Sequence, residues 1–432
     1  ITLDLNGKTI KNTQDIWGDN ANAILRITNG AKVTITGNGT IDAKENDCYA
    51  INVAEGDLTI ENGTFYGNVS VVQVQEGTLF VKGGAFDLHQ KWEGGSRYLI
   101  NCIDDAYVDG SAKVAISGGT FVGFDPNVSP EQKVDGKAPS FAAPGVGITK
   151  NEDGSFTAAA GMTAQILDKD GNSVKACASL QAAIDTAQDG ETVTLLTDAT
   201  EDVVINKSIT LDLGGKTLTN TNSGKATISV QGGIVTVKNG NVVGGTSYYN
   251  IEVKKDSNAS LTLTDVTATA GNTGSSMIDN WGTLTITSGS YTGGLDVVKS
   301  EEGSKLTITG GTFTLDYATS GYTAVILVYG DTTISGGEFI QSLTTTGRWN
   351  HPQVIATGFV EGYTAITRVT GGNFVNKMSG ESIFRGIGKG TSDNFEVSGG
   401  TFNKEVSEGY CADGFIPTKN ADGTYGVKEG HY

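Results

Sequence analysis

Residues suited to binding a ligand gather in two stretches of this 432-residue chain. The first stretch is HQKWEGGSRY (89–98), and the second is GRWNHPQ (347–353). Together they contain two of the three histidines and two of the four tryptophans. A tryptophan flanked by arginine and histidine suits stacking on a sugar ring and hydrogen bonding to its hydroxyl or carboxylate groups. The predicted ligand-binding residues are His89, Trp92, Arg97, Arg348, Trp349 and His351.

A structural role is the alternative for both stretches. Each loop would then fold back so that its tryptophan covers hydrophobic side chains, while the arginine and histidine stay in water. The ligand hypothesis predicts that Trp92→Ala or Trp349→Ala abolishes glycan binding and leaves the melting temperature near that of the wild type. The structural alternative predicts a large loss of stability instead.

Other motifs that carry chemistry are missing from the sequence. There is no P-loop, dinucleotide fingerprint, HExxH or GxSxG. The four cysteines show no CxxC or zinc-type spacing, so they indicate neither a metal site nor a disulfide framework. No cofactor is predicted, although the acidic charge would tolerate Ca²⁺ at scattered aspartates.

The composition narrows the class of protein and its partners. Sixty-one glycines and six prolines, with abundant threonine, valine and isoleucine, are typical of many short strands joined by tight corners. The net charge of −18 repels nucleic acid and anionic lipid. No run of about eighteen apolar residues is present, so we predict no membrane insertion within this chain. The chain begins at Ile1 in mid-strand, and we expect that a preceding segment with any leader or anchor has been removed.

A ten-residue pattern recurs along the chain and predicts the fold. In LTITGGTFTL (306–315), Leu306 and Ile308 point to one face, Gly310 and Gly311 form a corner, and Phe313 starts a new segment. Related stretches recur about 20–35 residues apart, and a β repeat of this length is typical of one turn of a solenoid. We expect aliphatic columns to stack from turn to turn. The predicted columns contain Val53, Val74, Val230 and Val298, and Leu58, Leu79, Leu284 and Leu306.

The repeats form two predicted units. FAAPGVGITKNEDGSF (141–156) and YCADGFIPTKNADGTY (410–425) share the signature of a β-hairpin with an Asp-Gly turn, so both units are expected to end in the same way. Residues 164–177 indicate another hairpin, and 179–190 indicate a helix with Ser179 as N-cap and Gly190 at its end. The predicted domains are 1–158, without an N-terminal cap, and 159–432, with a cap module at 162–200 and a closing hairpin at 405–430.

Several of these segments resemble a known family. INKSITLDLGGKTLT (205–219), ISGGTF (116–121) and SLQAAIDTAQDGETVTLLTD (179–198) are similar to the right-handed parallel β-helices of the pectin lyase-like superfamily. With the closing NADGTYGV (420–427), they resemble secreted, cell-surface repeat proteins of gut Firmicutes. The resemblance implies an all-β fold of two tandem right-handed parallel β-helix units with a short helix-plus-hairpin cap module between them.

The resemblance is specific for architecture and weak for activity, because this superfamily includes enzymes and non-catalytic adhesins. Members that hydrolyse polygalacturonan carry four motifs on successive turns, and only an Asp-Asp pair, Asp104-Asp105, matches here. Lyase-like members need a carboxylate cluster for Ca²⁺ and a base. Arg97, Asp104, Asp105 and Asp109 are the weak alternative for such a catalytic site.

The resulting hypothesis is a non-catalytic bacterial protein, extracellular or attached to the cell surface. It would act as an adhesin or stalk whose loops bind glycans or a host or bacterial surface protein. The alternative is a polysaccharide lyase or glycoside hydrolase that acts on uronate-containing polysaccharide. A phage tailspike-like trimer fits less well, because the cap module divides the chain into two units.

Overall fold

The structure is a computed structural model that describes residues 1–18, 22–90, 97–128, 139–317, 323–344, 352–358, 365–387 and 390–430. In these residues the regular structure is almost entirely β, with two α-helices and two short 3₁₀ turns. The all-β prediction is confirmed. The chain divides into two compact units, Ile1–Ser179 and Leu180–Tyr432. This division follows the hairpin at 164–177, whereas the predicted domain boundary at 158/159 precedes it.

The first unit consists mainly of three sheets, and successive strands of the repeat go to different sheets. The first sheet contains β1 (Thr2–Asp4), β4 (Ala31–Thr36), β7 (Gly56–Ile60), β10 (Gly77–Val81) and β13 (Ala112–Ile116). The second contains β2 (Thr9–Lys11), β5 (Thr40–Asp42), β8 (Thr64–Gly67), β11 (Ala85–Leu88), β14 (Gly118–Val122), β16 (Ser155–Ala160) and β15 (Val146–Lys150). The third contains β3 (Ala23–Ile27), β6 (Tyr49–Val53), β9 (Val72–Val74) and β12 (Ile100–Cys102), which helix α1 (Asp104–Asp109) follows.

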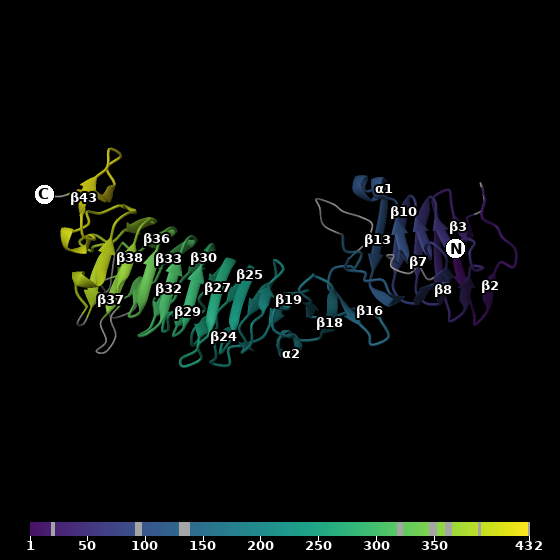
Figure 1. Cartoon of the computed structure of the whole chain (residues 1–432), viewed down its shortest axis with the longest axis horizontal. Helices are drawn as coiled ribbons and strands as arrows, with labels where there is room; N and C mark the ends of the chain where they lie inside the picture. The colour runs from purple at the N-terminus through teal and green to yellow at the C-terminus, as the bar shows by residue number, and fades with distance from the viewer. Residues whose placement is uncertain are drawn as a thin grey trace. The chain divides into compact units, whose positions relative to one another are not determined.

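Neighbouring strands of the repeat are parallel and in register. Leu58 pairs with Leu79, and Leu79 pairs with Val114. Figure 1 shows their strands β7, β10 and β13 side by side. Long parallel ladders of this kind are compatible with a β-helix. The first unit also contains the antiparallel hairpin of β17 (Ala164–Leu167) and β18 (Ser173–Cys177).

The second unit begins with helix α2 (Leu180–Thr186), which confirms the helix predicted near 179–190. A parallel sheet, the β21–β40 sheet, contains β21 (Val203–Ile205), β24 (Ile228–Val230), β26 (Ile251–Val253), β28 (Ile278–Asn280), β31 (Val298–Ser300), β34 (Ala324–Val328), β37 (Gln353–Gly358) and β40 (Phe384–Ile387).

The remaining strands of the second unit form two ladders that join where β25 and β27 continue through the corner. One ladder contains β19 (Thr192–Leu195), β22 (Thr210–Asp212), β25 (Ile234–Val243), β27 (Ser260–Thr269), β29 (Thr283–Ile286), β32 (Lys305–Ile308), β35 (Asp331–Ile334), β38 (Thr367–Val369) and β41 (Phe395–Val397). The other runs from β20 (Ala199–Thr200) and β23 (Thr217–Thr219) through β25 and β27 to β30 (Gly289–Thr292), β33 (Thr312–Leu315), β36 (Glu338–Gln341), β39 (Asn373–Asn376), β42 (Thr401–Phe402), β44 (Tyr425–Glu429) and β43 (Phe415–Lys419). The 3₁₀ turns are Ser392–Asn394 and Glu408–Tyr410.

The glycine pair of the repeat forms the predicted corner. Gly311 has a φ of +103°, which a side chain rarely adopts. A Cβ on Gly310 would lie 2.4 Å from the carbonyl oxygen of Thr287 on the preceding turn. Gly310 is therefore required by the close approach of two turns, and Gly311 is required by its backbone conformation.

Stacked aromatic rings fill the core beside these corners. In the second unit, Tyr291, Phe313, Phe339, Phe374 and Phe402 stack in sequence at centroid distances of 4.8–5.1 Å. In the first unit, Phe65, Phe86 and Phe121 stack in the same manner. Each ring buried in this way contributes roughly 1.5–3 kcal/mol through the hydrophobic effect.

The aliphatic columns differ from the prediction at one position. Val53 pairs with Val74 as expected, but Val298 pairs with Ile278 and lies outside the column of Val230. The column of Val230 continues through Val253 to Asn280 and Ser300, which are buried polar residues. Nδ2 of Asn280 donates a 3.0 Å hydrogen bond to Oγ of Ser300. Because the two polar groups satisfy each other, the column tolerates them.

Candidate functional site

The two described residues of the predicted 89–98 site are held by neighbouring strands. Nε2 of His89 lies 2.7 Å from Oδ1 of Asp42 in β5, and its ring stacks on Tyr66 at 5.1 Å. Arg97 forms an ion pair with Asp87 in β11 through Nη2. Both side chains are half-buried, and each has a carboxylate partner within its own unit.

The other four predicted ligand-binding residues lie outside the described residues. They are Trp92, Arg348, Trp349 and His351. Their role in ligand binding stays a prediction.

Three of the four residues of the catalytic alternative lie on helix α1. Asp104, Asp105 and Asp109 are exposed on this helix, while the ion pair of Arg97 is with Asp87. Oδ1 of Asp109 accepts a 2.8 Å hydrogen bond from the backbone N–H of Ser111, and hydrogen bonding to Ser111 lowers the pKa of Asp109. Among the described residues, no group of three or more His, Cys, Asp or Glu side chains is arranged to hold a metal ion.

A polar surface that the sequence analysis did not identify lies on the β21–β40 sheet. The middle residues of β24, β26, β28 and β31 pair in register and alternate with buried residues that are aliphatic except for Asn280 and Ser300. These middle residues are Ser229, Glu252, Asp279 and Lys299. They form one row across four successive turns.

A second row lies two residues further along these four strands and continues to the end of β34. Backbone hydrogen bonds continue the parallel ladder there, for example from the N–H of Trp281 to the carbonyl oxygen of Val253 at 3.0 Å. The second row consists of Gln231, Lys254, Trp281, Glu301 and Tyr329. Because side chains alternate along a strand, both rows share one face. We call these nine residues the polar face.

Glu252 is fixed by two neighbours on the polar face, Ser229 and Lys254, and by Tyr248 beside it. One carboxylate oxygen accepts a 2.6 Å hydrogen bond from Oγ of Ser229 and lies 3.5 Å from Nζ of Lys254. The other accepts a 3.3 Å hydrogen bond from the hydroxyl of Tyr248. This carboxylate is buried, and its lone pairs are largely occupied.

Asp279 lies deepest in the polar face, with 1% of its surface exposed. Nε1 of Trp281 donates a 2.9 Å hydrogen bond to its Oδ2. Burial, and then the negative charge of Glu301, raise the pKa of Asp279 to about 7. Lys299 forms an ion pair with Glu301. Burial by itself would lower the pKa of Lys299, but the hydrogen bond and charge of Glu301 outweigh burial and raise it.

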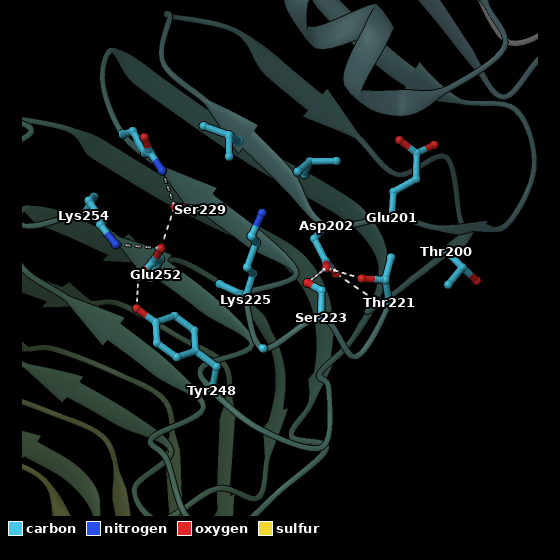
Figure 2. A pocket seen from close by; sticks show the side chains of 15 residues that line it. Thr200, Glu201, Asp202, Thr221, Ser223, Lys225, Ser229, Tyr248, Glu252 and Lys254 are labelled. Atoms are coloured by element: carbon cyan, nitrogen blue, oxygen red, sulfur yellow. Dashed lines mark hydrogen bonds and ion pairs between the residues drawn. The ribbon is translucent and has the colours of Figure 1, made fainter.

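A cavity of about 690 Å³ adjoins the first end of the polar face (Figure 2). Ser229, Gln231, Glu252 and Lys254 contribute to its lining. Tyr248, which is 36% exposed, has a φ of +77°, a conformation that is an outlier for a bulky side chain. Backbone strain of this kind costs on the order of 1–3 kcal/mol and tends to occur at functional sites.

The other side of the cavity carries a second carboxylate, that of Asp202. The hydroxyl of Ser223 donates a 2.5 Å hydrogen bond to Asp202, and Thr221 donates through both its backbone N–H, at 2.8 Å, and its hydroxyl. Burial would raise the pKa of Asp202, but these hydrogen bonds outweigh burial and lower it. Figure 2 shows the side chain of Lys225 extended between the Asp202 group and the Glu252 group.

The lining of the cavity suits a small polar ligand. Amino groups of Lys225 and Lys254 offer hydrogen-bond donors, and the carboxylates of Asp202 and Glu252, held by their own neighbours, add negative charge to the lining. The ring of Tyr248 supplies an apolar surface beside them. The volume lies in the range of cavities that hold small molecules.

Sequence reasoning missed this site because its residue types are common in an acidic chain. The available signal was a polar residue between two aliphatic residues in consecutive repeats, as in Ile228-Ser229-Val230 and Ile251-Glu252-Val253. The positive φ of Tyr248 and the in-register pairing of the strands cannot be recognised from the sequence.

No protein-family model matches the chain, and no curated protein or solved structure matches it either. None of the described helices is long and apolar enough to cross a membrane.

Proposed function

We propose that this chain is a non-catalytic, extracellular repeat protein that binds glycans in the cavity beside the polar face. The observation that carries the proposal is the joint lining of that cavity by Tyr248, two lysines and three carboxylates, among them Asp202 and Glu252. Sugars present hydroxyl groups around an apolar ring face, and this combination of groups complements them.

The state of Glu252 favours binding over catalysis. A general base must be free to accept a proton from its substrate. Glu252 already accepts hydrogen bonds from Ser229 and Tyr248 and pairs with Lys254. It is therefore better suited to holding a ligand hydroxyl or a neighbouring lysine in place than to proton transfer.

The proposal includes the finer architecture and the location. Two tandem right-handed parallel β-helices, as in the pectin lyase-like superfamily, would provide a rigid support on the surface of a bacterium. The parallel, in-register ladders of each unit support this architecture. A protein ligand on a host or bacterial surface is the other partner consistent with this role.

A glycan array probed with the full chain tests the function. We expect wild-type binding to be abolished by Tyr248→Ala and weakened by Lys225→Met, with the melting temperature little changed. Tyr317→Ala is the matched control, because Tyr317 is exposed and does not line the cavity. Absence of wild-type binding above background, or equal binding by Tyr248→Ala, would contradict the proposal.

A hydrolase or lyase for uronate-containing polysaccharide is the second candidate. The observation that favours it is the pKa of about 7 at Asp279, which would let this residue act as a general acid near neutrality. The burial of Asp279 opposes this role, because substrate must reach an acid that acts on it. Release of reducing ends or unsaturated uronates by the wild type, lost in Asp279→Asn, would establish the enzyme instead.

A further inference from the structure

The two closing hairpins of the chain have the same construction. β15–β16 and β43–β44 are antiparallel pairs, and β16 and β44 each pair antiparallel with a strand of their own unit. The two turns match as well, because Asp153 accepts from the N–H of Ser155 and Asp422 accepts from the N–H of Thr424, both at 2.9 Å. Residue Lys150 therefore corresponds to Lys419, Ile148 to Pro417, and Gly147 to Ile416.

The free edge of the first hairpin is occupied by the hairpin that follows it. Gln165 of β17, which is 2% exposed, faces the backbone of Ile148 in edge strand β15. Its Oε1 accepts a 2.7 Å hydrogen bond from the N–H of Ile148, and its Nε2 donates a 2.8 Å hydrogen bond to the carbonyl oxygen of Ile148. The side-chain amide thus satisfies both backbone groups that an edge strand would leave unpaired.

Gly147, next to Ile148, gives the β17–β18 hairpin the space that it needs. A Cβ on Gly147 would lie 2.3 Å from Cβ of Ala176 and 2.9 Å from Cβ of Met162. No side chain fits at that distance, so Gly147 allows β18 to pack directly on β15. The hydroxyl of Thr149 adds a 3.1 Å hydrogen bond from the N–H of Ala176.

The closing hairpin β43–β44 lacks both features, the free N–H at the position of Ile148 and the glycine at the position of Gly147. Pro417 has no N–H to donate at the position of Ile148, and proline on an edge strand opposes the addition of another strand. Ile416 places a branched side chain at the position of Gly147. Phe415, Ile416 and Pro417 are half-buried, whereas Val146, Gly147 and Ile148 are buried.

We propose that a closing hairpin such as β15–β16 is a docking surface for a β-hairpin of the type formed by residues 161–178. Two adjacent positions on its edge strand, 147 and 148 in the first unit and 416 and 417 in the second, decide whether docking occurs. Glycine followed by a residue with a free N–H accepts the hairpin, as at Gly147-Ile148. Isoleucine followed by proline prevents docking of the hairpin, as at Ile416-Pro417. The partner is recognised by its chemistry, which is a buried glutamine on one strand and a small residue on the other.

Substitutions at these positions in the full chain, followed by measurement of amide hydrogen exchange, test the proposal. In Gly147→Ile and in Ile148→Pro, we expect the amides of β17 and β18 to exchange about tenfold faster or more, because a buried polar group loses its partner or its space. Gln165→Met should have the same effect without altering the closing hairpin. Ile416→Gly is the mirror control and should leave β17 and β18 unchanged. Unchanged protection of β17 and β18 in Gln165→Met and Ile148→Pro would overturn the proposal.

A gain-of-docking experiment completes the test. Residues 161–179 are appended after Glu429 in place of residues 430–432, because Ala160 corresponds to Glu429. We expect slow amide exchange in the appended hairpin only when Ile416→Gly and Pro417→Ile are also present. Equal exchange in the two extended chains, whether fast or slow, would show that these positions do not decide docking.

Discussion

Nε1 of Trp281 donates a 2.9 Å hydrogen bond to Oδ2 of Asp279, which lies buried within reach of the negative charge of Glu301 in the polar face of the second unit. Oδ1 of Asp279 is buried and has no hydrogen-bond partner among the described residues, so ionisation of this carboxyl group is unfavourable. Burial and the charge of Glu301 raise the pKa of Asp279 to about 7, so the proton is retained well above the usual range of an aspartate.

This relationship predicts a loss of stability as pH rises. Because the folded pKa of Asp279 is above its unfolded value, its contribution is full below about pH 4 and is lost progressively as pH rises to about 7. Asp279→Asn should remove this part of the pH dependence and be relatively more stable than the wild type at pH 8 than at pH 4. Chemical unfolding at both pH values measures the difference.

Asp296 provides the internal control for that measurement. Its pKa is also raised to about 7 by burial, although it accepts hydrogen bonds from the N–H of Ala324 and the hydroxyl of Ser276. Asp279→Asn should therefore leave a residual decline due to Asp296. An identical pH profile in Asp279→Asn and wild type would contradict the raised pKa of Asp279.

Asp47 in the first unit should show the opposite pH dependence. Its carboxylate accepts hydrogen bonds from the N–H groups of Ile16 and Trp17, both at 2.9 Å, and from Nδ2 of Asn12 at 2.7 Å. Burial alone would raise the pKa of Asp47, and these hydrogen bonds outweigh burial and lower it. Its stabilising contribution is present above its unfolded pKa of about 4 and is lost as pH falls through the lower folded pKa.

Asp47→Ala should therefore destabilise the chain at pH 7 by about 1–3 kcal/mol, because three donors lose their acceptor. The difference from wild type should shrink near pH 3. Urea unfolding followed by tryptophan fluorescence is suitable, because Trp17 lies beside Asp47. A difference that grows toward low pH would show that the carboxylate is not stabilised in the folded chain.

Phe313 lies between two rings in the aromatic stack of the second unit. It is fully buried and lies 5.0 Å from the rings of Tyr291 and Phe339. Phe313→Ala should cost about 3–5 kcal/mol, because a cavity remains between turns that cannot collapse. Tyr317→Ala, at a residue that is 50% exposed, is the control and should change the free energy of unfolding little. A loss below about 1 kcal/mol in Phe313→Ala would mean that the stack does not hold the turns together.

Glu201 caps helix α2 from a distant position in the sequence. Its carboxylate oxygens accept hydrogen bonds from the N–H groups of Leu180, at 2.8 Å, and Gln181, at 3.0 Å. Glu201→Ala should destabilise the helix by about 1 kcal/mol, as the loss of an N-cap does. Amide exchange in residues 180–187 should accelerate while exchange in β32 and β33 stays unchanged. Equal exchange in the helix would exclude a capping role.

Local features of the fold could be predicted from the sequence because neighbouring residues decide them. Alternating Leu306 and Ile308 indicated a strand with one buried face, and Gly311 indicated the corner. The Asp-Gly turns at Asp153 and Asp422 indicated the two closing hairpins, which the structure contains. Helix α2 was also evident from the spacing of its buried residues.

Relations between turns could not be predicted, because they depend on register. Val298 was expected in the column of Val230, yet the structure pairs it with Ile278. Insertions of different length separate the strands, and a shift of two residues keeps the same face of a strand, so the alternation of side chains does not reveal it. The capping of helix α2 by Glu201 could not be predicted either, because it depends on a contact between residues about twenty positions apart.

The sequence by itself determined the repeating strands, the glycine corners and the two closing hairpins, since each follows from the conformations that a few adjacent residues can adopt. Only the tertiary structure decided that Ser229, Glu252, Asp279 and Lys299 share one row and that Tyr248 reaches Glu252. The physical reason is that parallel pairing aligns residues from separate turns, and burial between those turns then sets their charge and their hydrogen bonds.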